Sequence, residues 1–223
     1  MGFIIVIEGT DGSGKKTQTQ KLFERLKEDG KNVMAHAFPS YESESSGPVK
    51  MYLGGELGKT ADEIDAFQAS SLFAVDRFCT MKRFKEHLDN GGILLLDRYI
   101  QANMVHQAGK AKTEKEREEI LKFIEDFEFN VLKLPRADLV FFLDVPVEIS
   151  KRLANERTDL KTGKKQDIHE ADQSHLENAY KSAKIVAKKY GWHTIDCTDE
   201  QKNILPIDVI ANIIYNEAIK CLK

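Results

Sequence analysis

A short segment near the start of the chain has the residue types and spacing that bind a chain of phosphates. It is rich in glycine, ends in a lysine, follows an apolar run directly and precedes a stretch with helical periodicity. Glycines let the backbone curl so that successive N–H groups and a helix N-terminus face one anion, and the lysine adds a positive charge for the β- and γ-phosphates. The segment is therefore predicted to be a P-loop that binds the phosphates of a nucleotide. Its residues are Gly9, Thr10, Asp11, Gly12, Ser13, Gly14 and Lys15.

The position after the P-loop lysine departs from the usual pattern. A serine or threonine there would hold Mg²⁺, but this sequence has Lys16, and Thr17 follows one residue later. One residue turns a helical side chain by about 100°, so either water replaces the missing hydroxyl, with Asp97 as an outer partner, or Thr17 reaches across. We favour water and expect Lys16 to be a solvated helix residue. Lys16 and Thr17 complete the predicted phosphate-binding segment.

The P-loop needs a strand before it and a helix after it, and the rest of the chain repeats that alternation. Three apolar runs, residues 3–7, 93–96 and 139–143, are continuous, as strands buried on both faces must be. Residues 33–37 and 193–196 are shorter and more mixed, which suits flanking strands. The sequence therefore predicts an α/β fold, a three-layer P-loop fold with a five-stranded parallel sheet flanked by helices.

Helical periodicity fills the gaps between the predicted strands. The predicted helices span residues 15–28, 61–88, 114–132, 147–155, 168–190 and 207–222. Two segments, residues 39–47 and 157–167, have the length and composition of mobile loops, and the second holds Lys161, Lys164 and Lys165. No linker divides the chain, so we expect one domain over residues 1–223.

Composition argues against several classes of protein. The chain has 223 residues, 33 Lys and Arg against 36 Asp and Glu, and a formal net charge of -3, so no basic field favours nucleic acid. No apolar run approaches the roughly 20 residues of a membrane helix, and no signal peptide is expected. Cys79, Cys197 and Cys221 have neither disulfide-framework nor zinc-site spacing. We expect a cytoplasmic protein without nucleic-acid or membrane partners.

A P-loop by itself fits kinases, GTPases and partition proteins alike. The sequence has no N-K-x-D motif for reading guanine, which argues against a regulatory GTPase. Asp97-Arg98-Tyr99 stands at the end of a predicted central strand, where α/β sheets place ligands. Phe73 and Arg77 are four residues apart and share one helical face, so a ring can stack on a base while a guanidinium donates to it. The alternative from spacing alone is a core phenylalanine and a solvated arginine.

Together with Asp11 in the P-loop and Phe38-Pro39-Ser40-Tyr41 after the second strand, these motifs resemble the thymidylate kinase family over nearly the whole chain. The resemblance implies transfer of the γ-phosphoryl group of ATP to dTMP, giving dTDP and ADP in dTTP synthesis. ATP is then the co-substrate and Mg²⁺ the metal. Phosphoryl transfer needs positioning and charge stabilisation rather than covalent help from the protein.

The resemblance also assigns the base and sugar contacts of the acceptor. Asp11 is implied to contact the 3′-hydroxyl group of dTMP. Phe38 and Tyr41 are implied to border the acceptor site, with Tyr41 in a place where many relatives have arginine. Phe73 is implied to stack on the pyrimidine, and Arg77 to donate to its O4 atom.

Further residues are implied to hold the acceptor phosphate and the metal. Arg98 is implied to grip the dTMP phosphate, and Asp97 to orient the waters around Mg²⁺. Asn103 and His106 stand where relatives contact the base and the sugar edge, with His106 in place of a common tyrosine. Lys15, Asp97 and Arg98 are thus the expected catalytic residues outside the lid.

Residues 157–167 resemble the lid that closes over ATP in this family. Many bacterial members have glycine, as here at Gly12, where others have a P-loop arginine, and they supply the catalytic cation from the lid. Arg157 is the arginine of this lid, and the three lid lysines either share its task or are solvated. Asp167 and Glu170 resemble the acids that border the acceptor site.

The resemblance implies a homodimer, and the predicted helix at residues 61–88 has more apolar residues than one sheet-facing stripe needs. We therefore expect the dimer to form through this helix. Two other functions stay open. A kinase for another acceptor, such as a deoxynucleoside or CMP, would share the P-loop, and a P-loop regulatory or partition protein would hydrolyse ATP slowly and ignore dTMP.

Overall fold

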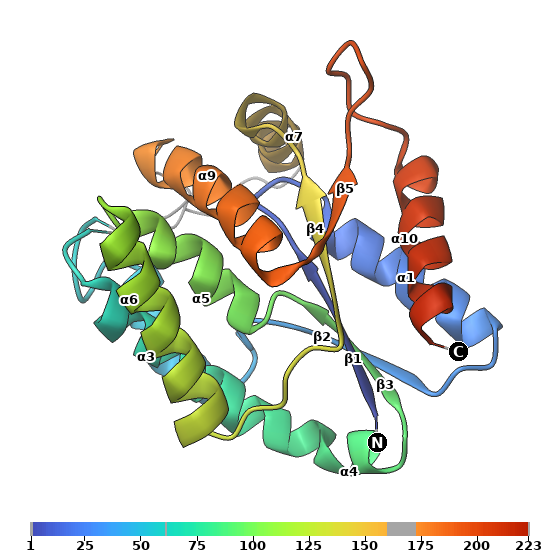
Figure 1. Cartoon of the computed structure of the whole chain (residues 1–223), viewed down its shortest axis with the longest axis horizontal. Coiled ribbons are helices and arrows are strands. Elements are labelled where there is room, and N and C mark those ends of the chain that lie inside the picture. Colours follow the sequence, from blue (N-terminus) through green and yellow to red (C-terminus); the bar gives the residue numbers. More distant parts are fainter. Residues whose placement is uncertain (1, 61, 160–172, 223) are drawn as a thin grey trace.

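Five parallel strands form one sheet in the computed structural model, which describes residues 2–60, 62–159 and 173–222, with side chains described outside residues 154–159 and 173. The spatial order is β2-β3-β1-β4-β5 (Figure 1). The strands are β1 (Phe3–Glu8), β2 (Val33–Ala37), β3 (Ile93–Asp97), β4 (Leu139–Asp144) and β5 (His193–Asp196). The three continuous apolar runs are the three central strands, so the predicted sheet is confirmed.

The register of the central strands brings the chemistry to one edge of the sheet. β1 pairs with β3 on one side and β4 on the other, and Ile7 is aligned with Asp97. Because the strands are parallel, the P-loop after β1 and the residues after β3 leave the sheet side by side. Asp97 and Arg98 therefore face the P-loop.

Helices cover both faces of the sheet (Figure 1). α1 and α10 pack on the face that carries Ile5 and Ile7, while α3, α5 and α6 pack on the face that carries Ile4 and Val6. The helices are α1 (Lys15–Glu28), α2 (Gly47–Leu53), α3 (Ala66–Met81), α4 (Lys85–Asp89), α5 (Ile100–His106), α6 (Glu114–Glu125), α7 (Val147–Asp159), α9 (Gln173–Tyr190) and α10 (Ile207–Cys221). Among the described residues, no helix has the length and hydropathy to cross a membrane.

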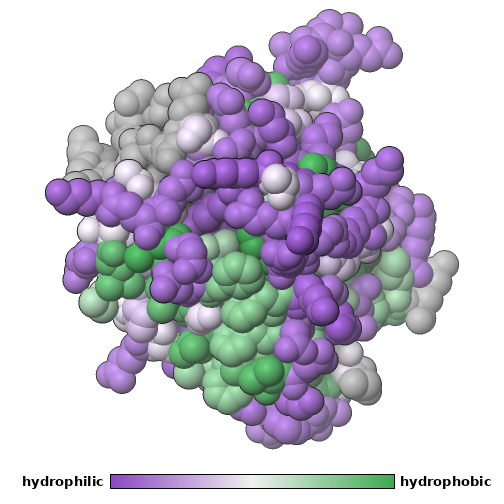
Figure 2. Space-filling model, turned by 60° about the vertical axis from the view of Figure 1, so that its left-hand side comes forward, coloured by the Kyte–Doolittle hydropathy of each residue, from purple (hydrophilic) through white to green (hydrophobic). Residues whose placement is uncertain are grey.

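The helix predicted at residues 61–88 is wrong at its start and is interrupted near its end. α3 begins at Ala66 because the Asp65 carboxylate accepts hydrogen bonds from the N–H groups of Phe67 and Gln68, at 2.8 and 2.9 Å. A 3₁₀ turn at Lys82–Phe84 then separates α3 from α4. α3 still presents exposed apolar side chains, and Figure 2 shows hydrophobic residues gathered on the side of the molecule where α3 and α6 lie.

The helix predicted at residues 114–132 is α-helical only over its first three turns and then becomes a π-helix. Thr113 caps the start of α6 by accepting from the Glu116 N–H group, and α6 passes into a π-helical segment at Asp126–Val131. The Leu132 N–H group donates to the Phe127 carbonyl oxygen, five residues back, at 2.9 Å. This wide turn carries Glu128, which is buried.

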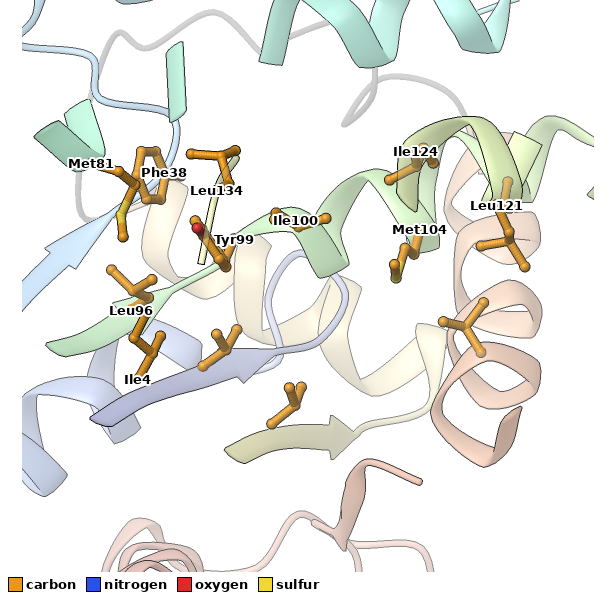
Figure 3. Packing of buried hydrophobic residues seen from close by; sticks show 14 of the residues in the cluster. Ile4, Phe38, Met81, Leu96, Tyr99, Ile100, Met104, Leu121, Ile124 and Leu134 are labelled. Carbon is orange, nitrogen blue, oxygen red and sulfur yellow. The ribbon is translucent and has the colours of Figure 1, made fainter. Parts of the chain in front are cut away.

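Side chains from the sheet and from this helical layer meet in the core next to the site. Figure 3 shows Leu96 and Ile4 from the strands, with Ile100 and Met104 from α5 and Ile124 from α6, pointing into one cluster. This cluster fixes α5 and α6 against the end of β3. The residues of α5 that face the site are therefore rigidly placed.

Residues 39–47, predicted to be a mobile loop, are held in place by Asp76 on α3. The Asp76 carboxylate accepts from the Ser40 N–H group at 2.8 Å and from the Ser45 hydroxyl group at 2.6 Å. The segment contains a 3₁₀ turn at Glu44–Ser46 and leads directly into α2. The sequence could not reveal this, because the anchor lies more than 30 residues away.

Candidate active site

A pocket of about 370 Å³ opens at the carboxyl ends of β1 and β3. It is bordered by the P-loop, the end of β2, α3 and α5, so one cavity collects residues from several elements of the first half of the chain. The predicted site residues that line it are Asp11, Gly12, Gly14, Lys15, Lys16, Phe38, Tyr41, Phe73, Arg77, Asp97, Arg98, Asn103 and His106.

Four of the other predicted residues are described in the structure but are not among those that line this pocket. Gly9, Thr10 and Ser13 form the turn of the P-loop beneath it, and Thr17 is exposed on α1. Residues 157–159, predicted to begin a loop, are instead the last residues of α7, which runs to Asp159. The side chain of Arg157, together with Asp167 and Glu170, lies outside the described residues. The predictions made for these three residues stay predictions.

The P-loop holds its lysine against its own backbone. Lys15 Nζ donates to the carbonyl oxygens of Gly9, at 2.9 Å, and Thr10, at 2.8 Å. Burial, and then the nearby Arg98 guanidinium, lower the pKa of Lys15. The Lys15 ammonium group is thus hydrogen-bonded to two carbonyl oxygens of the P-loop. A phosphate oxygen of a ligand can take the place of these carbonyl oxygens as its acceptor.

Helix α7 closes tightly on the P-loop at Gly12. Gly12 has a φ of 84°, and a Cβ atom placed on it would lie 2.0 Å from the Ser150 carbonyl oxygen. No side chain fits in that space. An arginine at this position, as in part of the family that the sequence resembles, would require α7 to move.

Arg98 joins the P-loop to α5 through two side chains. Its guanidinium forms an ion pair with Asp11 and, through Nη1, donates to His106 Nε2 at 2.8 Å. The ring of His106 stacks on that of His175, with Nδ1 and Nε2 3.3 Å apart. Arg98 has a φ of 66°, a conformation that is strained for a residue with a side chain and is found preferentially at functional sites.

Carboxylates around Arg98 keep it charged in spite of burial. Burial alone would lower the pKa of Arg98, but the negative charges of Asp11, Glu8 and Asp97 outweigh it and raise that pKa. The result is a fixed positive charge between the P-loop and α5. That is the arrangement needed to bind the phosphate group of a second substrate.

At the opposite end of the pocket, Arg77 and Asn103 share one buried partner. Arg77 donates from Nε and Nη2 to the two carboxylate oxygens of Glu128, each at 2.6 Å. Asn103 Nδ2 donates to Glu128 Oε1 at 2.8 Å and to the Ser70 carbonyl oxygen at 3.0 Å. The expectation of a solvated arginine is thereby excluded, since Arg77 is 2% exposed.

These contacts decide what the pocket offers to a ligand at this end. Both amide hydrogens of Asn103 are used, so its carbonyl oxygen Oδ1, an acceptor, is left for a ligand. Arg77 has only donors, and Nη1 and Nη2 each keep an N–H group beyond those bonded to Tyr99 and Glu128. Phe73 adds an aromatic ring beside them, with its edge contact to Tyr52 fixing the ring. This end of the pocket therefore offers a ligand an aromatic ring, a hydrogen-bond donor and a hydrogen-bond acceptor.

Comparison with known proteins identifies one family over most of the chain. The family model for thymidylate kinase matches residues 7–205. The chain belongs to the thymidylate kinase family. Family membership makes it a nucleoside-monophosphate kinase that uses ATP as phosphate donor.

Curated relatives and a solved structure agree with this assignment. A thymidylate kinase of Mycobacterium tuberculosis is 29% identical over 76% of this chain and 78% of its own length, and a probable thymidylate kinase of Methanocaldococcus jannaschii is 30% identical over 98% and 95%. The structure of thymidylate kinase from Candida albicans superposes with a TM-score of 0.69 at 20% identity, covering 100% of this chain and 94% of that one. At that identity the structure shows the shared fold.

Two carboxylates of this thymidylate kinase family member lie at the carboxyl ends of neighbouring strands, Glu8 at the end of β1 and Asp97 at the end of β3. Asp97 lines the pocket. Glu8 is fully buried; its Oε1 atom accepts from the Gly9 N–H group at 2.9 Å, while Oε2 has no partner among the described residues. Burial raises the pKa of Glu8. No group of three or more metal-ligating side chains occurs in the described parts of the chain.

Sequence reasoning missed four residues that shape the site. Glu128 and Glu8 are buried carboxylates, and each carried a signal. Glu128 continues the buried stripe of Ile120 and Ile124 at four-residue spacing, and Glu8 ends an otherwise apolar strand. His175 and Ser150 carried no signal, because nothing local in the sequence places them beside α5 or the P-loop.

Proposed function

We propose that the pocket binds dTMP with its base between Phe73, Arg77 and Asn103 and its phosphate at Arg98, and that ATP binds at the P-loop. The observation that supports this placement best is the order of hydrogen-bonding groups at the base end. Thymine presents an acceptor, O4, next to a donor, N3–H. Arg77 offers the matching donor and Asn103 Oδ1 the matching acceptor.

The same order of groups disfavours cytosine. Cytosine presents an amino donor and the N3 acceptor in those places, so each would meet a group of its own kind. Two unpaired buried groups at about 1 to 3 kcal/mol each give a penalty of roughly 2 to 6 kcal/mol. Uracil keeps both groups and lacks only the methyl group, which is worth about 1 to 3 kcal/mol in an apolar pocket.

The phosphate end of the pocket supplies the charges for transfer. Arg98 holds the acceptor phosphate in line with the γ-phosphate of ATP, and Asp11, which the structure pairs with Arg98, receives the 3′-hydroxyl group. Lys15 leaves the carbonyl oxygens of Gly9 and Thr10 and follows the charge that develops on the transferred group. No covalent intermediate with the protein is needed.

The residues present fit a magnesium ion that the nucleotide itself carries. Mg²⁺ keeps several waters and takes one or two carboxylates together with substrate phosphates, and the pocket offers Asp97 with Glu8 behind it. Asp97 would hold the ion through its waters, and Thr17, exposed on α1, is not needed. Held there, Mg²⁺ would neutralise negative charge on the phosphates of ATP during transfer.

We place the remaining catalytic cation in the lid, at about residues 157–167 of a single domain that spans residues 1–223. The crowding of Gly12 by Ser150 supports this, because the P-loop has no room for an arginine of its own. Arg157 is the candidate for that cation. Asp167 and Glu170 are the candidates for the acidic border of the acceptor site.

ADP release with different acceptors tests the proposed function. With ATP and Mg²⁺, we expect rapid ADP release with dTMP, slower release with dUMP, and release with dCMP close to that without acceptor. Indifference of ADP release to dTMP would instead favour a P-loop regulatory or partition protein. Equal use of dCMP and dTMP would refute the base site, and a preference for a deoxynucleoside would indicate another class of kinase.

We also propose a homodimer through an apolar face formed by α3, α6 and the π-helical segment that follows α6, defined by Phe67, Val75, Phe123 and Phe127. Phe67 and Val75 are 40% and 43% exposed, and the ring of Phe67 meets the edge of Phe123, which stacks on Phe127. Figure 2 shows hydrophobic side chains gathered on this side. A second copy would cover them.

Sedimentation of the wild-type chain and of two matched variants tests the dimer. We expect a dimer at micromolar concentration, dissociation in Val75→Asp, and no change in Ile213→Asp, whose residue is 37% exposed on α10. A wild-type monomer would refute the proposal.

The three cysteines are free thiols in the structure. A cytoplasmic location stays a prediction.

A further inference from the structure

One buried carboxylate behind the pocket holds both groups that face the base. Glu128 belongs to the π-helical segment at Asp126–Val131, is 1% exposed, and does not itself line the pocket. The residues that precede it on the same buried face, Ile120 and Ile124, are apolar. Glu128 is thus a charged residue at a core position. Such a residue needs a reason, because burying an ionised carboxylate is costly unless it is paired and hydrogen-bonded.

The geometry of Glu128 is that of a clamp. Its two oxygens accept in parallel from Arg77 Nε and Nη2, each at 2.6 Å, which is the bidentate arrangement that fixes a guanidinium in plane. Oε1 also accepts from Asn103 Nδ2 at 2.8 Å. One carboxylate therefore orients side chains from two helices, α3 and α5.

The contacts of Glu128 fix the conformation of the Arg77 side chain and the orientation of the Asn103 amide, and both would otherwise vary and weaken base recognition. An arginine side chain has several rotatable bonds and loses much entropy on being ordered, so a free Arg77 would sample many positions. An asparagine amide presents a donor and an acceptor of nearly the same shape, so a free Asn103 could turn its NH₂ group to the ligand. Bonding Nδ2 to Glu128 and to Ser70 leaves Oδ1 as the outward group.

We propose that Glu128 is the positioning residue that sets the donor–acceptor order of the base site, and so the choice of thymine over cytosine. The proposal rests on the proposed function, since it assigns the base to Arg77 and Asn103. Glu128 touches no substrate atom and acts through these two residues. Its charge also cancels that of Arg77, so the base is read through hydrogen bonds rather than by a bare cation.

Substitution of Glu128 by glutamine tests this with little change in shape. In Glu128→Gln an NH₂ group replaces one carboxylate oxygen. In place of Oε2 it faces Arg77 Nε, and in place of Oε1 it faces both Arg77 Nη2 and Asn103 Nδ2, so in either orientation a donor meets Arg77 and the bidentate contact is broken. We expect the KM for dTMP to rise about tenfold or more, since one misplaced hydrogen bond is worth about that factor. The ratio of kcat/KM for dTMP to that for dCMP should fall by a similar factor, because the Arg77 donor that meets the amino group of cytosine is no longer held in place. The KM for ATP should stay within about twofold.

Two further variants separate positioning from simple loss of stability. Glu128→Asp keeps the charge with a shorter reach, and we expect it to retain more of the dTMP preference than Glu128→Gln. Asp138→Asn weakens a contact far from the pocket, where the Asp138 carboxylate accepts from the Ile4 N–H group at 2.8 Å. It is expected to lower the unfolding temperature without changing the KM for dTMP or the dTMP-to-dCMP ratio.

The outcomes distinguish failure of this inference from failure of the proposed function. A wild-type enzyme that does not phosphorylate dTMP refutes the function before any variant is made. A wild-type enzyme that prefers dTMP, together with a Glu128→Gln variant that keeps both its KM for dTMP and its preference, refutes the role of Glu128. So does an equal change in Asp138→Asn. If Glu128→Gln does not fold, unchanged KM and preference in Glu128→Asp refute the role as well.

Discussion

Placing a single methyl group on the P-loop at Gly12 should disturb the enzyme more than at any open glycine with the same backbone. The built Cβ atom of Gly12 lies 2.0 Å from the Ser150 carbonyl oxygen and 2.8 Å from the Ser150 carbonyl carbon. Both are backbone atoms of α7, so no side-chain rotation relieves the contact. Gly14 is the matched control, because its φ of 87° is close to the 84° of Gly12 and nothing lies within 4 Å of its built Cβ atom.

The magnitude follows from two separate costs. A positive φ costs an L-residue roughly 1 to 2 kcal/mol, and both Gly12→Ala and Gly14→Ala incur this. Only Gly12→Ala must also push α7 away, and overpacking of this kind costs typically about 1 to 3 kcal/mol. We therefore expect Gly12→Ala to be less stable than Gly14→Ala by about 2 kcal/mol. For a chain of this size that is roughly 4 to 8 °C in unfolding temperature.

Thermal unfolding of the two variants without nucleotide measures this difference. Equal unfolding temperatures would refute the inference that α7 closes on the P-loop. A Gly12→Arg variant extends the test to catalysis, and we expect it to be less stable still and less active than wild type. A Gly12→Arg variant with undiminished turnover would show that the P-loop can host its own arginine and would remove the support for a cation from the lid.

Three further outcomes are expected. Lys15→Ala should fold and lose several orders of magnitude in kcat, because the P-loop cation stabilises the transferred group; near-normal turnover in a folded variant would contradict this. Arg157→Ala should lower kcat for dTMP more than it raises the KM for dTMP, and a change confined to the KM for ATP would point to a lid lysine instead. Burial lowers the pKa of Lys110 from 10.5 to about 8, so the folded state holds fewer protons than the unfolded state between these values, and stability relative to Lys110→Met should rise as the pH increases through that window. Urea unfolding at several pH values measures this, and a constant difference in the free energy of unfolding between wild type and Lys110→Met would refute the prediction.

The sequence predicted the parts of this structure that depend on local pattern. Continuous apolar runs identified β1, β3 and β4, and the P-loop identified where α1 begins, because both signals lie within a few residues of the element they describe. The pocket residues on β3, α3 and α5 were placed by resemblance to a family rather than by periodicity. Spacing alone put Phe73 and Arg77 on one face but could not say that the face was buried.

What the sequence could not predict depends on partners that are distant along the chain. Glu128 lies 51 residues from Arg77, and its role appears only when α6 is packed against α3. The order in residues 39–47 comes from Asp76, and the crowding of Gly12 comes from Ser150. In each case the decisive contact is tertiary, so no local preference encodes it.

The two ends of the pocket differ in how open their charges are to the solution. Arg77 and Glu128 are 2% and 1% exposed, whereas the side chains of Arg98 and Asp11 are 16% and 31% exposed. Dissolved ions screen a pair of charges less the more deeply it is buried. With dTMP bound as proposed, we therefore expect added salt to act more on the binding of its phosphate group than on the recognition of its base. Ionic strength would then change how tightly this enzyme binds its acceptor more than which acceptor it selects.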